Sequence, residues 1–600
     1  MSLSGARSGR RWRVIVAAIL LVCLFVLSSC IPVTGERPKP TPTPTLVPDD
    51  VGEILVYVYD SANQASVNGA VARVTNSAIV DGSDHRELRL ASCDQGQFLV
   101  VSAPGYETHF TPCNGSSAYY IALMKISAVD NINYSWSSAY SSCGTCHAGQ
   151  LGDGYNEVAE WEQSGHARVF ADPFFSSLYR GTNVNGQVTT STVNYGPGFK
   201  LTYPDQAGDC AFCHAPAAIL PSMEPTDLTS YYPRPAGVNG EGVTCDVCHK
   251  VSNVLLDDEY PPADKPGVQS LQFLRVSNSF VFGPFTNILL PANDESQKHS
   301  GSSCSPVLSR SELCAACHYR SFNDIPIYNS YGEWKESKFG RNSRNAAYKT
   351  CQDCHMSHMD VTNVSTPLSL RSACSETMDQ YQSFDHNLMD VGPTDSGQVV
   401  PRMIRNAASL KVKLTYEPEQ GNSLNVRVEV ENKRAGHKFP TDSPLRHLIL
   451  VVSANDQFEF PLALVDGEEL PDWAGAGSQN GVEGYAGRPG VIFANLLVEE
   501  ATNLSPTAAY WNQTRYAFTT EDGKNSDTRL VPGEPQVSDY SFTVPDFGEM
   551  HITVKLIYRY AFFDLMDQKD WLRPDVVVAV ADCRMSLEQG HKMDCPEIEP

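Results

Sequence analysis

Hydrophobic and polar residues alternate along two stretches of the chain, and this pattern predicts β structure in both. One face of the first predicted strand carries Ile54, Val56 and Val58, and the other carries Leu55, Tyr57 and Tyr59. Turn residues follow at short intervals, as they do between strands. We therefore expect a small β domain over residues 53–127.

A second β domain is predicted over residues 405–582. Aliphatic and polar residues alternate from 424 to 431, which indicates a strand with one buried face. Apolar runs at 448–452 and 576–580 predict buried strands, and alternation returns at 552–560. These strands favour a β-sandwich. Residues 583–600 are expected to form a tail closed by a disulfide.

The intervening residues 128–404 show little regular periodicity, so short helices separated by long loops are expected there. Six hundred residues are also too many for one compact core and predict two to four domains. The predicted fold class is a multidomain protein with a β-sandwich at each end and a mostly helical and loop domain between them.

The first residues have the features of an export signal. A positively charged start precedes an apolar run at 14–27, which is too short for a comfortable membrane span. The run ends in Leu27-Ser28-Ser29-Cys30, which resembles a bacterial lipobox. The resemblance implies a signal peptide over 1–29 and acylation of Cys30. A plain signal peptide with an incidental cysteine, or an uncleaved anchor, is the alternative.

Residues 30–52 contain alternating proline and threonine, a composition typical of an extended polyproline II tether. With the lipobox, this tether predicts an exported protein, lipid-anchored on the outer side of the cytoplasmic membrane or to the outer membrane. The net charge of −24 argues against nucleic acid and against anionic lipid heads as partners. It fits a solvated surface, or one that attracts basic proteins or cationic substrates.

The cysteines carry the most specific chemical signal in the chain. Ten of the 18 fall in five copies of Cys-x-x-Cys-His, whereas the residue frequencies predict roughly 0.01 copies by chance. The five motifs are Cys143/Cys146/His147, Cys210/Cys213/His214, Cys245/Cys248/His249, Cys314/Cys317/His318 and Cys351/Cys354/His355. This is the attachment motif for c-type haem.

The chemistry of haem attachment explains the spacing. Two thiols add to the two vinyl groups of one porphyrin, and the following histidine supplies an axial ligand to the iron. A lone Cys-x-x-Cys is also compatible with a zinc knuckle or a redox pair, but here every copy carries the histidine. The motifs therefore predict five covalently attached haems in 128–404, whose porphyrins would replace much of the ordinary hydrophobic core.

Six cysteines remain beyond the motifs, the signal segment and Cys30. Outside the cytoplasm an even number indicates disulfides, and six cysteines allow fifteen pairings. Sequence proximity favours the pairs Cys93–Cys113 and Cys583–Cys595, which leaves Cys304 with Cys374.

Electron-transfer haems usually take a second protein ligand, whereas an open position suggests substrate chemistry. The candidates for the second ligand are His166, His299, His386 and His437, while His358 is undecided because it stands only three residues after His355. An internal echo adds one observation: Glu333-Trp-Lys-Glu-Ser337 repeats Glu160-Trp-Glu-Gln-Ser164, but Phe339 stands where the first copy has His166. The echo therefore suggests that one haem lacks its second histidine ligand, which would leave its iron open. No catalytic residue is assigned.

Several strings resemble multihaem cytochromes of the cytochrome c-554 type. They are Glu241-Gly-Val-Thr-Cys-Asp-Val-Cys-His249, Leu313-Cys-Ala-Ala-Cys-His318, Glu333-Trp-Lys-Glu-Ser337, Cys351-Gln-Asp-Cys-His-Met356, Gly436-His-Lys-Phe-Pro-Thr441 and Asp527-Thr-Arg-Leu-Val-Pro-Gly-Glu534. The resemblance implies stacked haems, bis-histidine ligation and redox protein partners. It also implies a relationship to multihaem reductases, although no Cys-x-x-Cys-Lys motif is present. The string ending in Tyr106 is similar to carboxypeptidase regulatory-like modules, which implies an Ig-like sandwich for 53–127.

Three functions follow as hypotheses. The first is electron transfer between a redox donor and an acceptor outside the cytoplasm, which predicts six-coordinate irons throughout. The second is reduction or oxidation of a small nitrogen or sulfur compound at one open haem. The third is an adhesion or scaffold role carried by the β domains. The oligomeric state is not predicted.

Overall fold

The computed structural model describes residues 53–598 with internal gaps. The gaps are 75–79, 82–86, 104, 108, 149–155, 221, 233–236, 257–264, 277–279, 284, 287–300, 357, 361–371, 374–381, 390, 394–398, 418–421, 480, 521–522, 524 and 589–591. The predicted signal peptide, the lipidation site Cys30 and the tether lie outside the described residues. Residues 52–600 belong to one compact unit. Within the described ranges, no helix has both the length and the apolar character needed to cross a bilayer.

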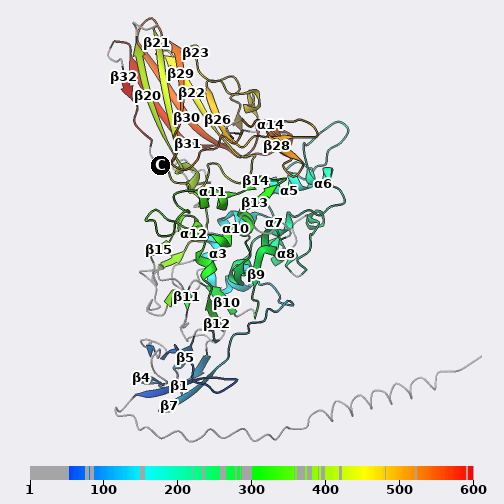
Figure 1. The fold of residues 1–600 in the computed structure, drawn as a ribbon, viewed down its shortest axis with the longest axis vertical. Coiled ribbons are helices and arrows are strands. Elements are labelled where there is room, and N and C mark those ends of the chain that lie inside the picture. Colours follow the sequence, from blue (N-terminus) through cyan, green and yellow to red (C-terminus); the bar gives the residue numbers. More distant parts are fainter. Residues whose placement is uncertain are drawn as a thin grey trace, which may run out of the picture. The chain divides into compact units, whose positions relative to one another are not determined.

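Residues 53–127 form two small sheets around a shared core (Figure 1). The three-stranded sheet has the order β4 (Glu87–Leu90), β1 (Ile54–Asp60), β7 (Ala118–Leu123), and the four-stranded sheet has the order β3 (Val80–Asp81), β2 (Val71–Val74), β5 (Phe98–Ser102), β6 (His109–Pro112). Strands β1 and β7 are parallel. The predicted disulfide Cys93–Cys113 is present, and both cysteines belong to the core. The Ig-like assignment stays a prediction.

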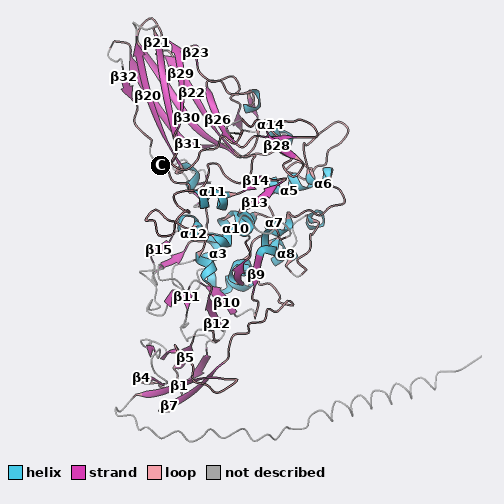
Figure 2. Ribbon diagram, viewed as in Figure 1, coloured by secondary structure: helices cyan, strands magenta, loops and turns pink. Residues whose placement is uncertain are grey.

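Most of the helices lie in the middle of the sequence, and strands dominate toward both ends (Figure 2). The helices are η1 (Ala139–Cys143), α2 (Gly144–His147), α3 (Glu157–Gln163), α4 (Gly165–Arg168), α5 (Pro173–Arg180), α6 (Phe199–Thr202), α7 (Ala211–His214), α8 (Pro216–Ile219), η2 (Leu228–Tyr231), η3 (Val238–Gly240), α9 (Cys245–His249), η4 (Gly267–Ser270), η5 (Pro306–Ser309), α10 (Glu312–His318), α11 (Ser330–Glu336), α12 (Cys351–His355) and α13 (Arg402–Arg405). All are short, as the lack of periodicity in this stretch predicts.

Short two-stranded ribbons connect these helices. They pair β8 (Val251–Val254) with β9 (Leu271–Phe273), β10 (Phe280–Gly283) with β12 (Gly301–Cys304), β11 (Phe285–Thr286) with β16 (Ser372–Ala373), β13 (Arg320–Phe322) with β14 (Ile325–Tyr328), β15 (His358–Asp360) with β17 (Gln382–Phe384), and β18 (Val391–Pro393) with β19 (Val399–Pro401). Each ribbon is two to four residues long, so the connections between the motif helices are mostly irregular backbone.

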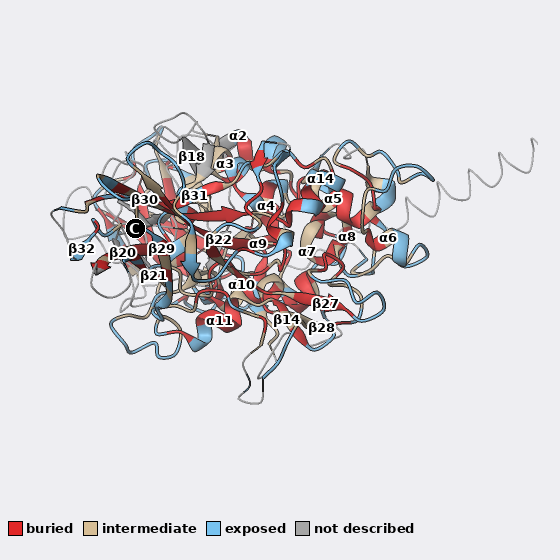
Figure 3. Cartoon of the chain, turned by 90° about the horizontal axis from the view of Figure 1, so that it is seen from above, coloured by how far each residue is buried: buried red, intermediate tan, exposed pale blue. Residues whose placement is uncertain are grey.

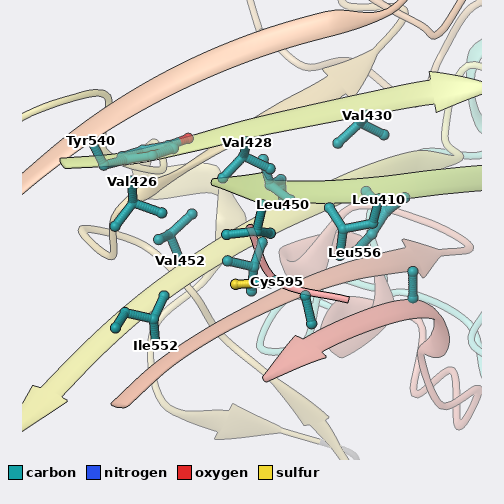
Figure 4. Close-up of a cluster of buried hydrophobic side chains, with 14 of the residues drawn as sticks. Leu410, Val426, Val428, Val430, Leu450, Val452, Tyr540, Ile552, Leu556 and Cys595 are labelled. Atoms are coloured by element: carbon teal, nitrogen blue, oxygen red, sulfur yellow. The ribbon is translucent and has the colours of Figure 1, made fainter. Parts of the chain in front are cut away.

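Two larger sheets share a core in the C-terminal part of the chain. Their orders are β23 (Leu464–Asp466), β29 (Gln536–Thr543), β21 (Ser423–Asn432), β20 (Ala408–Glu417), β32 (Lys592–Asp594), and β26 (Gly490–Ala494), β22 (His447–Asp456), β30 (Glu549–Arg559), β31 (Val576–Ser586). Figure 4 shows side chains of both sheets, among them Val428 and Leu450, meeting in this core. Strands β22 and β30 are buried along most of their length (Figure 3).

The alternation at 424–431 falls in β21, where every second side chain is buried. The run at 448–452 is fully buried in β22, as predicted. The prediction of a buried strand at 576–580 was wrong for Val577 and Val580, which are exposed because β31 has one face outside the core. The disulfide Cys583–Cys595 is present. It joins β31 to the short edge strand β32.

The smaller elements of this part are β24 (Ser478–Gln479) with β25 (Val482–Glu483), β27 (Leu497–Glu499) with β28 (Thr514–Tyr516), η8 (Asp472–Ala474) and α14 (Phe563–Gln568). Helix α14 packs against the haem-motif part of the chain. After it, Lys569 donates hydrogen bonds to the backbone carbonyls of Ser177, Thr182 and Pro197 at 3.1, 3.1 and 2.7 Å. Loops of the C-terminal sheets therefore help to build the walls around the motifs.

Candidate functional site

Each Cys-x-x-Cys-His motif ends a short helix, namely α2, α7, α9, α10 or α12. Residues three positions apart lie on the same side of a helix, so the two cysteines of a motif face one way. The side chain of Cys146 is outside the described set, and the other nine motif cysteines form no disulfide with a described residue. Burial raises the pKa of Cys210 to about 12 and that of Cys248 to about 11.

All five motifs line one cavity of about 2210 Å³. A pocket for one small molecule measures about 300–1,000 Å³, so this cavity has room for more than one such group. Thiols of different motifs also touch within it. Cys143 lies close to Cys245, Cys213 to Cys317, and Cys314 to Cys351. The motifs are therefore contiguous in space.

The motif histidines are oriented by acceptors at Nδ1. Three rings approach backbone carbonyls: His249 and Phe282 at 2.7 Å, His355 and Leu388 at 2.8 Å, and His214 and Val169 at 3.4 Å. Two rings approach carboxylates: His318 and Asp442 at 2.7 Å, and His147 and Glu157 at 3.4 Å. A partner at one ring nitrogen fixes the tautomer and directs the other nitrogen to a metal. Nε2 is thus the nitrogen available in all five.

Three of the motif histidines face a second imidazole. The ring centres of His355 and His437 are 6.1 Å apart, those of His249 and His386 are 6.4 Å apart, and those of His166 and His318 are 6.5 Å apart. An imidazole nitrogen binds a metal at about 2.0–2.1 Å, so two imidazoles on opposite sides of one iron have ring centres roughly 6 Å apart. The three pairs fit one metal ion each.

The histidine of the second motif has different surroundings. His214 stacks on Phe175, with ring centres 3.8 Å apart and planes inclined by 10°. Among the described side chains, no imidazole faces it. The side chains of His299 and His358 lie outside the described set, so their predicted roles stay predictions. His147 is the other motif histidine for which they are candidates.

The two Glu-Trp-x-x-Ser strings make equivalent hydrogen bonds in the structure. Trp161 Nε1 donates to the carbonyl of Val243 at 2.8 Å, and Trp334 Nε1 donates to that of Lys349 at 2.7 Å. Both carbonyls stand two residues before the first cysteine of a motif. In each string the serine hydroxyl donates to the tryptophan carbonyl, at 2.6 and 2.8 Å. Helices α3 and α11 therefore hold the third and fifth motifs in the same way.

The glutamates of the two strings also have equivalent roles. Glu160 Oε2 accepts from the backbone N–H of His386 at 3.1 Å, and Glu333 Oε2 accepts from that of Lys438, next to His437, at 3.1 Å. Each helix thus joins a motif to the segment that carries the facing imidazole. Phe339 packs in the cluster around Trp334, while His355 already faces His437. Phe339 therefore does not mark a missing ligand at the fifth motif.

A cluster of ion pairs holds the backbone next to His437. Arg529 pairs with Glu333 at 2.9 Å and with Asp527 at 2.7 Å, and Lys438 Nζ donates to Asp527 at 2.8 Å. Burial by itself would raise the pKa of Asp527, but Arg529 and Lys438 outweigh it and hold this pKa below its usual range. The strings that contain Glu333, Lys438 and Arg529 were identified in the sequence only by their resemblance to multihaem cytochromes. Their electrostatic role was not predicted.

The sequence also missed Asp442, Glu157 and Phe175, which contact motif histidines. No short sequence motif marks these residues. Asp442 and Phe175 are distant along the chain from the histidines they contact, and Glu157 lies in a stretch of ordinary composition. In the described part of the chain, no group of three or more His, Cys, Asp or Glu side chains forms a site for a bare metal ion.

No protein-family model matches the sequence, and no curated protein matches it. Among solved structures, the chain is similar to a penta-heme cytochrome c552 from Thermochromatium tepidum. The two share 18% sequence identity with a TM-score of 0.48, over 75% of this chain and 99% of that one.

Proposed function

We propose that the protein is a multihaem cytochrome c that transfers electrons outside the cytoplasm through five covalently bound haems, most of them with two histidine ligands. The observation that carries the proposal is the set of three imidazole pairs with ring centres 6.1–6.5 Å apart, each containing the histidine of a Cys-x-x-Cys-His motif. The motif cysteines would hold the porphyrins, and His166, His386 and His437 would supply second ligands.

The chain's own residues would hold each group rigidly. When bound, haem supplies one-electron redox chemistry, and two protein ligands keep its coordination unchanged between oxidation states. The acceptors at Nδ1 fix the ring planes, and the largely apolar lining limits the access of water. The thiol contacts between motifs place neighbouring sites side by side, which electron transfer along the chain requires.

A second candidate function is favoured by one observation. Neither His147 nor His214 faces an imidazole among the described side chains, and Phe175 stacks on His214, so the haem of Cys210 and Cys213 is one candidate for an open iron. At such a site the protein would act as a reductase or oxidoreductase of a small nitrogen or sulfur compound. The expected redox donor and acceptor, the export route and the lipid anchor at Cys30 belong to both candidates and rest on the sequence.

The test combines haem counting by the pyridine haemochrome spectrum with low-temperature EPR of the oxidised holoprotein. Five haems with low-spin signals only would support the carrier and remove the second candidate. A high-spin signal from about one haem, perturbed by nitrite or hydroxylamine and lost in a Cys210→Ala/Cys213→Ala variant, would favour the second candidate. Fewer than five haems would contradict the first proposal.

A variant addresses the ligand pairs directly. His437→Gln should convert one low-spin haem to high spin and leave the haem count at five. His551→Gln is the matched control, because His551 pairs with Glu459 on the C-terminal sheets and does not line the cavity. Unchanged EPR spectra in both variants would show that His437 is not a ligand.

A further inference from the structure

A basic surface follows helix α11, next to the fifth motif. Residues 335–349 contain five basic side chains and one acidic one, Glu336, in a chain of net charge −24. All five are exposed: Lys335, Lys338, Arg341, Arg344 and Lys349. We call this segment the basic loop. Its local charge is opposite in sign to that of the protein as a whole.

The basic loop is held at both of its ends. Ser337 ends helix α11, and the backbone N–H groups of Gly340 and Arg341 donate to its carbonyl at 3.2 and 3.0 Å. At the other end, the N–H of Lys349 donates to the carbonyl of Phe339 at 3.1 Å, and Trp334 Nε1 donates to the carbonyl of Lys349. The loop therefore returns to Trp334, the residue directly before it, so its two ends are held together.

Four of these positive charges have no ion-pair partner within the described part of the protein. Lys338, Arg341, Arg344 and Lys349 form no ion pair with a described residue, and Lys338 Nζ lies 5.1 Å from the ring centre of Phe339. Exposed cations that face solvent together produce a local positive potential, which attracts a partner of opposite charge over a Debye length.

The basic loop adjoins the motif that lies nearest the surface. Cys354 is exposed, whereas the other described motif cysteines are only partly exposed. Lys349 stands two residues before Cys351 and also lines the cavity. After the first Glu-Trp-x-x-Ser string, His166 stands at the position equivalent to Phe339, and it faces His318 of the fourth motif. After the second string, Phe339 stands at this position, and the rest of the basic loop follows it.

We propose that the basic loop is the docking surface for an acidic redox protein that exchanges electrons with the haem of Cys351, Cys354 and His355. The inference rests on the proposed function and adds the site of exchange and the charge of the partner. One electron passes between the partner's redox centre and the haem iron, one being oxidised as the other is reduced, with no bond made or broken. The overall charge of −24 alone predicts basic partners, so the loop reverses that expectation locally.

The experiment uses the full-length holoprotein and reduced flavodoxin, a small flavoprotein of net negative charge, as the probe donor. Stopped-flow reduction rates are measured from about 10 to 150 mM salt, over which the Debye length falls from about 30 to 8 Å. The test variant is Lys338→Glu/Arg341→Glu/Arg344→Glu. The control is Lys555→Glu/Arg584→Glu/Lys592→Glu, which changes the same number of exposed charges on the C-terminal sheets.

The test variant should lose about tenfold or more of the low-salt rate and most of its salt dependence, because electrostatic steering contributes factors of about 10–10³. The control variant should stay within about twofold of the parent. Equal losses in both variants, or none in the test variant, would overturn the proposal. Both variants must retain the haem count and EPR spectrum of the parent, whereas fewer than five haems in the parent would refute the proposed function instead.

Two further outcomes also overturn the docking proposal. The parent sedimenting as a dimer at low salt, and the test variant as a monomer, would assign the loop to a second, acidic copy of this chain. Co-sedimentation of the parent but not the test variant with phosphatidylglycerol vesicles would assign it to an anionic membrane. A monomeric parent that does not bind these vesicles supports the protein partner.

Discussion

Replacing Asp442 by asparagine should change the redox potential of one haem and leave the others unchanged. Asp442 is buried, with Oδ2 2.7 Å from Nδ1 of His318 and Oδ1 accepting from the backbone N–H of Ser330 at 3.0 Å. Burial by itself would raise the pKa of Asp442, but His318 outweighs it and holds this pKa well below its usual range. Asp442 is therefore an anion that faces the imidazole of the fourth motif.

The magnitude follows from the type of contact. A carboxylate at the second nitrogen makes an imidazole a stronger donor and favours the oxidised metal, and such partners contribute about 10–100-fold to metal binding. Tenfold corresponds to about 59 mV for a one-electron couple. Asparagine keeps the shape and one oxygen acceptor but removes the charge. The midpoint potential of one haem should therefore rise, by about 60–120 mV at most, the value reached when the whole factor acts on the oxidised state.

The assay is a spectroelectrochemical titration of the holoprotein, resolved into five one-electron steps. Asp539→Asn is the matched control, because Asp539 is exposed on β29 and pairs with Arg427. A single step that moves upward in the Asp442 variant alone is expected. Unchanged potentials, a downward shift, or equal shifts in both variants would refute the reasoning.

Three further changes test how the fold is held together. Lys569→Met removes three hydrogen bonds to buried carbonyls and should lower the free energy of unfolding by about 1–3 kcal/mol in urea titrations. Burial lowers the pKa of Lys569 to about 8, so the unfolded chain binds more protons between about pH 8 and 10.5. Stability should therefore rise with pH across that window in the parent but not in the variant. Trp334→Phe removes the hydrogen bond to Lys349 and should cost about 1 kcal/mol in the same titration. Cys583→Ser/Cys595→Ser opens a disulfide that spans 12 residues and should cost about 2–3 kcal/mol, measured by thermal unfolding.

Each of these expectations has a clear contrary result. The same pH dependence of stability in the parent and the Lys569 variant would show that the pKa of Lys569 is not lowered in the folded state. An unchanged Trp334 variant would mean that its indole N–H is satisfied by water in the unfolded chain as well as it is by the carbonyl. An unchanged melting temperature without Cys583 and Cys595 would show that β31 and β32 are held by pairing alone.

The motifs were predictable from sequence because haem attachment chemistry needs residues that are close along the chain. The strand at 424–431 was predictable for the same reason, since alternation is a local signal. The pairing of imidazoles was not, because His166 faces His318 across more than a hundred residues. Strings such as Glu-Trp-x-x-Ser could be found as an echo, but their hydrogen bonds to the third and fifth motifs depend on the folded chain.

The inference drawn from Phe339 shows the limit of local comparison. A missing histidine in a repeated string suggested an open iron, yet the fifth motif already has His437 from the C-terminal sheets. Among the described side chains, the first and second motifs have no facing imidazole, and in the second Phe175 stacks on His214. Nothing near Cys210 in the sequence signals this stacking, because Phe175 is remote from the motif along the chain.

The wide separation of the paired imidazoles has a consequence for biogenesis. An exported chain emerges from its N-terminus, so the cysteines at 245 and 248 reach the haem-attachment machinery well before His386 does. Those at 351 and 354 likewise precede His437, whereas His166 is already waiting when the fourth motif arrives. If the protein is exported and binds haem as proposed, attachment of the third and fifth haems as the chain emerges would occur while one axial side is still open, at a stage that oxygen or a small reductant can reach.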